Sequence, residues 1–243
     1  MEDDIKLRFK DAIWNKAPRL DITIGGVGGI GSWLSLYLSR IDRGYIYMYD
    51  DDVIEKHNLG GQLYLKTHIG SSKVDGMIEL LDHFGSDINH IETFEERIVS
   101  DTGIQEPICF SCFDNMEARK VLFDIWINNY NRASEEDKKN YLFIDGRLLA
   151  EQYQVYIVTP DRAVEYRKTL FNDSEVSDEG VCSYKQTSHF AAMIAARMAQ
   201  AYTNFLANLV QEDTYELPFF IQEEGPSFMV EIKDFEKNGE TSN

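Results

Sequence analysis

The glycine-rich segment from residue 26 to residue 32 is the first part of the chain whose residue types could do chemistry. It consists of Gly-Val-Gly-Gly-Ile-Gly-Ser and joins the apolar run at 22–24 to a helical pattern. A turn from strand to helix needs residues that can adopt positive φ. Phosphate oxygens need bare backbone N–H groups at the positive end of a helix. The sequence therefore predicts a cradle for a nucleotide phosphate, lined by Gly26, Gly28, Gly29 and Gly31.

An acidic residue follows at the spacing that such a cradle requires. The strand-like run at 45–49 ends in Asp50, which lies 24 residues beyond Gly26. This is close to the roughly 20 residues expected before a carboxylate that binds ribose. Residues 20–50 are therefore predicted to form a strand–helix–strand unit that binds a mononucleotide.

The elements that would position these residues alternate between strand and helix in the first half of the chain. Such alternation is typical of a parallel sheet with crossover helices, whose ligand-binding loops follow the carboxyl ends of the strands. Apolar spacing predicts helices over 33–41, 73–81 and 118–126, and strands over 91–99 and 107–113.

The second half has a different pattern. Strand-like runs at 141–145 and 152–158 are joined by a short segment with Gly146, which favours antiparallel pairing. Residues 159–187 are predicted to be irregular, and a long helix is predicted over 190–209. A last hairpin is predicted from 218–221 and 228–232. We therefore expect an α/β, Rossmann-like three-layer fold with a mixed sheet, parallel in its N-terminal part and antiparallel in its C-terminal strands.

Charge and composition limit the classes of partner. A net charge of -18 over 243 residues works against binding nucleic acid or an anionic membrane surface. The apolar stretches are shorter than the ~18 residues of a membrane span, and the first residues lack a signal pattern. Three cysteines are too few for a secreted disulfide framework. We therefore expect a cytoplasmic protein with reduced thiols.

Three further groups of polar residues follow the glycine turn in order. They are Asp50-x-Asp52 with Asn58-Leu-x-x-Gln62, Gly70-x-x-Lys73 at a helix start, and Asp114-Asn115 with Arg119 downstream. Together with the turn, they resemble the ThiF/MoeB/HesA family of adenylating enzymes, relatives of the ubiquitin-activating enzymes. The resemblance implies one adenylation domain over 1–243, with a nucleotide-binding half at 20–130 and a partner-binding half at 141–233.

That resemblance also implies an activity. The family uses ATP to activate the C-terminal carboxylate of a small ubiquitin-like protein or peptide, and its members generally work as homodimers. Such a site must neutralise phosphate charge and position Mg²⁺-bound pyrophosphate as the leaving group. The implied roles are ribose binding by Asp50, an acidic edge completed by Asp52, phosphate binding by Asn58, Gln62 and Lys73, and Mg²⁺ binding by Asp114.

One position departs from the family pattern. The family loop carries an arginine before the glutamine, and here that residue is Gly61. An arginine would offer a bidentate positive charge to the β- and γ-phosphates, so its loss is expected to weaken ATP binding or slow catalysis. Arg147 could supply the charge, or Arg8 could do so across a dimer interface. The alternative is a pseudoenzyme or scaffold subunit that binds nucleotide without activating a carboxylate.

The cysteines suggest two different roles. Cys109 and Cys112 lie in an apolar run without a second pair, and tetrahedral zinc needs four ligands, so we expect core positions and no structural zinc. Cys182 precedes the long helix, about where some relatives place a thiol that accepts the activated partner as a thioester or persulfide. A thiolate near a helix start is favoured by the helix dipole and by Lys185, whereas Asp178 and Glu179 oppose it. A catalytic role for Cys182 therefore stays open.

A dinucleotide-dependent oxidoreductase is a third alternative. The glycine turn and Asp50 alone would allow it, but that class gives no required role to Lys73 or Asp114. We therefore rank it last.

Overall fold

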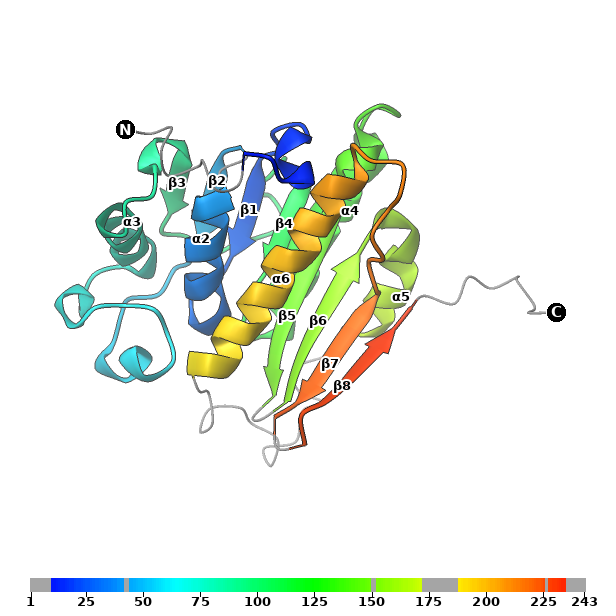
Figure 1. The fold of residues 1–243 in the computed structure, drawn as a ribbon. Coiled ribbons are helices and arrows are strands. Elements are labelled where there is room, and N and C mark those ends of the chain that lie inside the picture. The colour runs from blue at the N-terminus through cyan, green and yellow to red at the C-terminus, as the bar shows by residue number, and fades with distance from the viewer. Residues whose placement is uncertain (1–9, 42–43, 150–151, 172–187, 226, 235–243) are drawn as a thin grey trace.

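A single sheet of eight strands runs through the molecule (Figure 1). The computed structural model describes residues 10–41, 44–149, 152–171, 188–225 and 227–234. The order of strands across the sheet is β3-β2-β1-β4-β5-β6-β7-β8. In chain order they are β1 Ile22–Gly25, β2 Ile46–Tyr49, β3 Ile91–Phe94, β4 Ile108–Ser111, β5 Leu142–Leu149, β6 Gln152–Val158, β7 Phe220–Glu224 and β8 Met229–Lys233.

The sheet is mixed, as predicted. The strands from β3 through β5 are parallel, and β6, β7 and β8 continue the sheet in antiparallel pairing. Gly25 at the end of β1 lies between Tyr49 of β2 and Ser111 of β4. The loops that follow these three strands therefore leave the sheet side by side, at the edge where α/β folds bind ligands.

Helices cover both faces of the sheet (Figure 1). On one face α2 (Gly29–Ile41) packs against α6 (Ser188–Asn208), and on the other lie α4 (Met116–Arg132) and α5 (Ala163–Lys168). Next to α2, at the β3 end of the sheet, lies α3 (Lys73–His83). The short 3₁₀ helices are η1 Ile13–Lys16, η2 Lys56–Gly60, η3 Lys66–His68, η4 Ile88–His90, η5 Lys138–Asn140 and η6 Pro160–Arg162.

Each face of the sheet has its own core. Ile144 of β5 belongs to the core under α2 and α6, whereas its neighbour Phe143 belongs to the core under α4 and α5. The second core is aromatic: the ring centroid of Phe143 lies 5.6 Å from that of Trp126 and 5.3 Å from that of Tyr166. Burial on both faces explains why the central strands are continuous apolar runs.

Several predicted boundaries are wrong, among them those that follow β3 and β6. The strand predicted over 91–99 ends at Phe94, whose carbonyl oxygen accepts a hydrogen bond from Asp50 N at 3.2 Å before the chain turns outward. The irregular segment predicted over 159–187 begins instead with η6 and α5. Proline suits the first turn of a helix, and Pro160 opens η6. The fully buried ring of Tyr166 then anchors α5.

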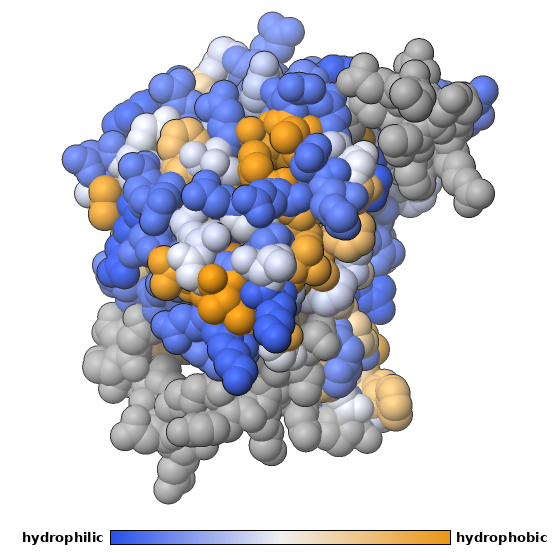
Figure 2. Space-filling view, turned by 90° about the vertical axis from the view of Figure 1, so that its left-hand side faces the viewer, coloured by the Kyte–Doolittle hydropathy of each residue, from blue (hydrophilic) through white to orange (hydrophobic). Residues whose placement is uncertain are grey.

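Within the described residues, no helix combines the length and apolarity needed to cross a membrane. Figure 2 shows the end of the molecule that carries α3, where apolar patches are interspersed with polar residues. The exposed apolar side chains of that end include Val53, Leu65, Ile69 and Phe84.

Candidate active site

The glycine turn has the shape that its sequence predicts. β1 ends at Gly25, Gly26 adopts a φ of +85°, and α2 begins at Gly29. A Cβ atom on Gly31 would overlap the carbonyl oxygen of Gly26, so the turn itself excludes a side chain there. The N-terminus of α2 therefore lies directly behind an open backbone turn, an arrangement suited to phosphate.

Gly28 faces the side chains of Lys73 and Gln62. A Cβ atom placed on Gly28 would lie 3.8 Å from Lys73 Nζ and 3.9 Å from Gln62 Nε2. These are ordinary van der Waals distances, so packing does not require a glycine at this position. The buried Oε1 atom of Gln62 has no hydrogen-bond partner within the described part of the chain. This amide therefore keeps bonding capacity for a ligand.

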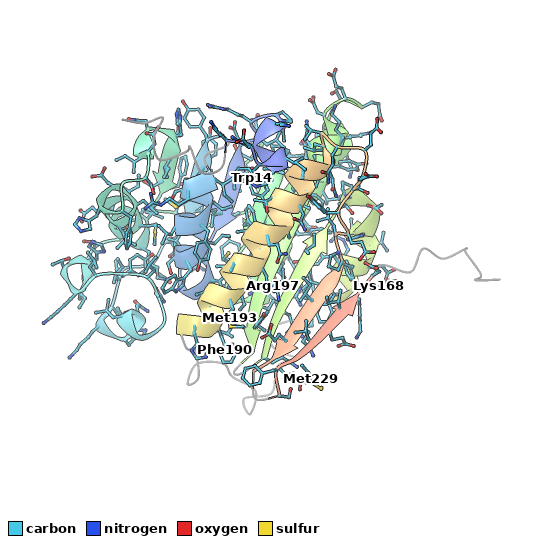
Figure 3. The ribbon with its side chains drawn as sticks, viewed as in Figure 1. Trp14, Lys168, Phe190, Met193, Arg197 and Met229 are labelled. Atoms are coloured by element: carbon cyan, nitrogen blue, oxygen red, sulfur yellow. The ribbon has the colours of Figure 1, made fainter. Side chains whose placement is uncertain are left out.

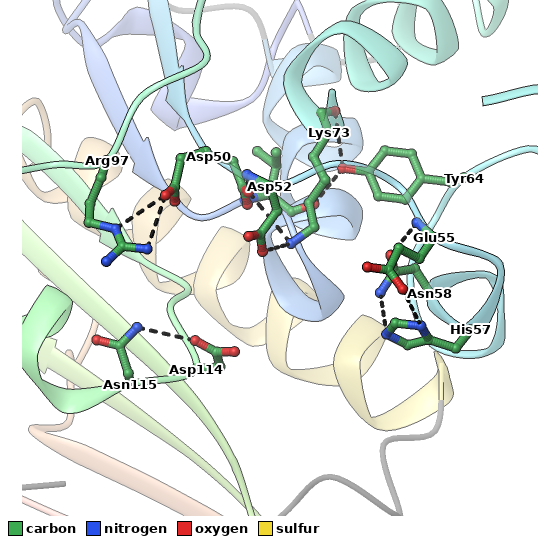
Figure 4. Close-up of polar contacts among 12 residues, drawn as sticks. Asp50, Asp52, Glu55, His57, Asn58, Tyr64, Lys73, Arg97, Asp114 and Asn115 are labelled. Carbon is green, nitrogen blue, oxygen red and sulfur yellow. Dashed lines mark hydrogen bonds and ion pairs between the residues drawn. The ribbon is translucent and has the colours of Figure 1, made fainter. Parts of the chain in front are cut away.

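Asp50 ties the end of β2 to the glycine turn. Its Oδ2 atom accepts a hydrogen bond from Val27 N at 2.8 Å, and its Oδ1 atom accepts one from Asp52 N at 3.0 Å. Lys73 is the first residue of α3, and its Nζ atom donates to Asp52 Oδ2 at 2.6 Å and lies 3.5 Å from Asp50 Oδ1 (Figure 4). The structure thus brings these three predicted site residues together beside the turn.

Burial and charge oppose each other in this group. Burial raises the pKa of Asp50, although the Lys73 ammonium and two backbone hydrogen bonds act to lower it. Burial would lower the pKa of Lys73, but the carboxylates of Asp50 and Asp52 outweigh burial and raise it. Lys73 therefore stays charged and can exchange a carboxylate partner for a phosphate oxygen.

Asp114 follows β4 at the same edge of the sheet. Its side chain is exposed and accepts a hydrogen bond from Asn115 Nδ2 at 3.2 Å. Asn115, and not Asp114, caps α4 by accepting a hydrogen bond from Ala118 N at 2.8 Å. The Asp114 carboxylate is therefore accessible to a metal ion. Among the described residues, Asp50, Asp51 and Asp52 form an acidic group whose possible metal-ligand atoms lie within 4.8 Å of one another. Asp114 does not belong to this group.

Asn58 is bonded within its own loop. Its Oδ1 atom accepts a hydrogen bond from Glu55 N at 2.7 Å, and its Nδ2 atom lies 3.2 Å from His57 Nε2 (Figure 4). The structure therefore does not join this predicted phosphate ligand to Lys73 by a hydrogen bond. Gly61 ends the same 3₁₀ turn with a φ of -134°, a value that does not require glycine.

A buried cluster of charges lies behind the Asp114 loop. Asp145 is fully buried and accepts hydrogen bonds from Arg119, from Arg147 Nε at 2.6 Å and from the Tyr166 hydroxyl at 3.0 Å. Burial opposes ionisation of Asp145, but Arg119 and Arg147 outweigh it and lower its pKa. Arg119 also donates to the carbonyl oxygen of Phe113, so the cluster holds the backbone just before Asp114.

Arg147 is committed to this cluster. Arg147 is only 5% exposed. Besides its contact with Asp145, its Nη1 atom donates to the backbone oxygen of Thr169 at 3.1 Å, and its Nη2 atom donates to the Thr169 hydroxyl at 3.0 Å. It also lies 4.3 Å from the centroid of the Tyr156 ring. The structure does not bring Arg147 to Lys73, and its use as the replacement arginine stays a prediction that these contacts disfavour. Arg8 lies outside the described residues.

Cys109 and Cys112 occupy different cores. Cys109 packs under α4 and α5, whereas Cys112 packs under α2 and α6. Burial raises the pKa of both thiols. The two sulfur atoms therefore belong to separate apolar environments, which suits the predicted core positions. Cys182 lies outside the residues that the structure describes.

The sheet order, the glycine turn and the edge loops define a Rossmann-like α/β protein. The particular family can also be stated. The chain belongs to the ThiF family, whose model matches residues 5–241. This confirms the resemblance predicted from the order of the motifs.

Curated relatives match parts of this chain. Ubiquitin-like modifier-activating enzyme 5 of Arabidopsis thaliana is 20% identical, over 83% of this chain and 51% of its own length. The enzyme of that name from Caenorhabditis elegans is 30% identical, over 42% of this chain and 27% of its own. Adenylyltransferase and sulfurtransferase MOCS3 of Culex quinquefasciatus is 32% identical, over 45% and 26%. The chain thus spans about half or less of the length of these relatives.

Solved structures share the fold. E. coli MccB with ATP aligns over 91% of this chain and 65% of that one, with a TM-score of 0.65 and 16% identity. PaaA aligns over 91% and 66%, with a TM-score of 0.67 and 17% identity. The family match and the shared fold therefore agree.

Proposed function

We propose that this chain is an ATP-dependent adenylyltransferase that activates the C-terminal carboxylate of a ubiquitin-like protein or a peptide. The observation that carries the proposal is the meeting of the glycine turn, Asp50 and Lys73 at one edge of the sheet. The relatives' names support it, since they describe activating enzymes for ubiquitin-like modifiers and an MccB bound to ATP. Other MccB structures contain MccA.

The phosphates and the ribose of the nucleotide would contact different residues of the site. The phosphates would lie against Gly28 and the N-terminus of α2, with Gln62 beside them, and Lys73 would leave Asp52 for a phosphate oxygen. Asp50 would accept hydrogen bonds from the ribose hydroxyls, as a carboxylate after the second strand does in related folds. Asn58 would have to leave its contacts with Glu55 and His57 to reach a phosphate.

The proposed reaction is a substitution at the α-phosphorus of ATP. A carboxylate oxygen of the partner forms a bond to that phosphorus, and the bond to the bridging α,β-oxygen breaks, so that pyrophosphate leaves with the electron pair. Mg²⁺ would neutralise charge on the leaving pyrophosphate. Asp114 would hold that ion, since Mg²⁺ accepts one carboxylate together with phosphate oxygens and water. Positioning and electrostatics supply the catalysis.

The partner would dock on the half from residue 141 to residue 233. Its edge strand β8 is exposed along its whole length, and Phe228, Met229 and Ile232 are apolar. Figure 3 shows Phe190 and Met193 of α6 at the same end of the molecule as Met229. An exposed apolar edge of this kind suits a protein partner. Within this proposal, a homodimer, a cytoplasmic location and an acceptor role of Cys182 stay predictions.

A pseudoenzyme is the second candidate, and one observation favours it. Gly61 stands at the family's arginine position, and the donors of Arg147 are taken by Asp145 and Thr169. Titration of the protein with ATP and with NADH, each with and without Mg²⁺, tests the common nucleotide step. The proposal expects Mg²⁺-dependent ATP binding, whereas preferential binding of NADH would overturn it. ATP binding without pyrophosphate exchange for any candidate peptide would favour the pseudoenzyme.

A further inference from the structure

Arg97 is an exposed arginine next to the proposed nucleotide site. It lies three residues beyond β3, and its Nε and Nη2 atoms donate to Asp51 Oδ2 at 3.2 and 3.0 Å. The Arg97 side chain is 73% exposed. The pair therefore holds the guanidinium in place without burying its face.

The strand order places this pair relative to the nucleotide-binding residues. β3 lies beside β2, with Phe94 opposite Tyr49, and the glycine turn follows β1 on the other side of β2. The turn, Asp50 and Arg97 thus follow three adjacent strands in a row. Each of them leaves its strand at the same edge of the sheet.

A nucleotide has its own linear order of phosphates, ribose and base. If the phosphates lie at the glycine turn and the ribose at Asp50, the base lies beyond Asp50, where the chain leaves β3. The phosphate site is two strand spacings from β3, or roughly 10 Å. Arg97 therefore lies nearer to the expected position of the base than to that of the phosphates.

Other arginines at this edge do not offer a free face. Arg119 and Arg147 are both buried with Asp145. Arg97 differs from both of them because its side chain is exposed. A planar guanidinium stacks well on an aromatic ring, where its charge interacts with the π electrons.

We propose that Arg97 stacks its guanidinium on the purine base of the bound nucleotide, and that Asp51 is the positioning residue that orients it. This inference rests on the proposed function, because it takes the phosphate and ribose sites from there. It adds a residue outside the motifs that identify the family.

The test compares Arg97→Ala with a matched control. Arg167 also makes an exposed pair, from Nη2 to Asp124 Oδ1 at 2.6 Å, with exposed fractions of 56% and 49%. This pair links α5 to α4, so Arg167→Ala removes a similar ion pair away from the site. Titration calorimetry with ATP and with AMP measures the affinities. Arg97→Ala is expected to weaken both nucleotides by the same factor, roughly 3- to 30-fold, and Arg167→Ala to change neither.

A third variant separates stacking from charge. Arg97→Lys keeps the positive charge but loses the planar group, so its affinities should stay closer to those of Arg97→Ala than to those of the parent. Full recovery with lysine, or a loss for ATP without a loss for AMP, would overturn the stacking proposal. So would an Arg97→Ala variant that binds like Arg167→Ala. If the unchanged chain binds neither nucleotide, the proposed function fails as well, which distinguishes the two failures.

Discussion

Gly28 and Gly31 stand three residues apart in one turn, but an added methyl group would meet different surroundings. At Gly28 its neighbours would be Lys73 Nζ at 3.8 Å and Gln62 Nε2 at 3.9 Å. At Gly31 it would overlap a backbone carbonyl oxygen. The fold therefore requires glycine at position 31, whereas it leaves room for a side chain at position 28.

We expect Gly28→Ala to fold with a free energy of unfolding within about 0.5 kcal/mol of the parent, because no atom has to move. Its affinity for ATP should fall about tenfold or more, because the methyl group occupies the phosphate cradle. Gly31→Ala should lose at least about 2 kcal/mol of stability through overpacking. Urea unfolding and ATP titration measure both effects. If Gly28→Ala binds ATP as the parent does, the phosphates do not lie at this turn.

At the scale of elements, the Asp145 cluster joins β5 to α4 and α5. Its carboxylate balances two buried guanidinium groups. Removing one partner of a buried ion pair leaves uncompensated charge and costs about 3–5 kcal/mol. Asp145→Asn should therefore lose about that much free energy of unfolding at neutral pH, measured in urea. The exposed Asp213→Asn serves as its control and should change little.

The pH dependence of this loss has a definite sign. The folded pKa of Asp145 is lowered, so its charge stabilises the fold fully above the unfolded pKa of about 3.9. That stability is lost as the pH falls towards the folded pKa. The difference between the parent and Asp145→Asn should therefore shrink below about pH 4. A difference that stays constant in acid would mean that Asp145 stabilises through packing and not through charge.

Sequence patterns predicted the helices and strands better than the side-chain contacts between elements that are far apart in the sequence. The glycine turn, α2 and the hairpin of β5 and β6 follow from contacts between near neighbours in the chain. The pair of Arg97 with Asp51 joins residues 46 apart, and that of Arg119 with Asp145 joins residues 26 apart. Both pairs depend on which strands lie side by side, and no local pattern specifies that order.

At the scale of the whole molecule, the net charge of -18 repels an anionic ligand. Salt screens this repulsion, with a Debye length of about 10 Å at about 0.1 M. The association rate constant of a fluorescent ATP analogue should therefore rise about twofold from low to physiological ionic strength in stopped-flow measurements. Uncharged adenosine is the control and should show no change. Slower ATP association with added salt would contradict this view of the surface field.

The most direct test of the central claim is ATP–pyrophosphate exchange with candidate C-terminal peptides, in the parent, in Asp114→Ala and in Asp213→Ala. Exchange requires both carboxylate activation and its reversal, so nucleotide binding alone does not produce it. We expect Mg²⁺-dependent exchange in the parent and in Asp213→Ala, and a loss of about 100-fold or more in Asp114→Ala. Exchange that survives in Asp114→Ala at the parent's rate would contradict the site. A parent that binds ATP but never exchanges pyrophosphate would contradict the activity.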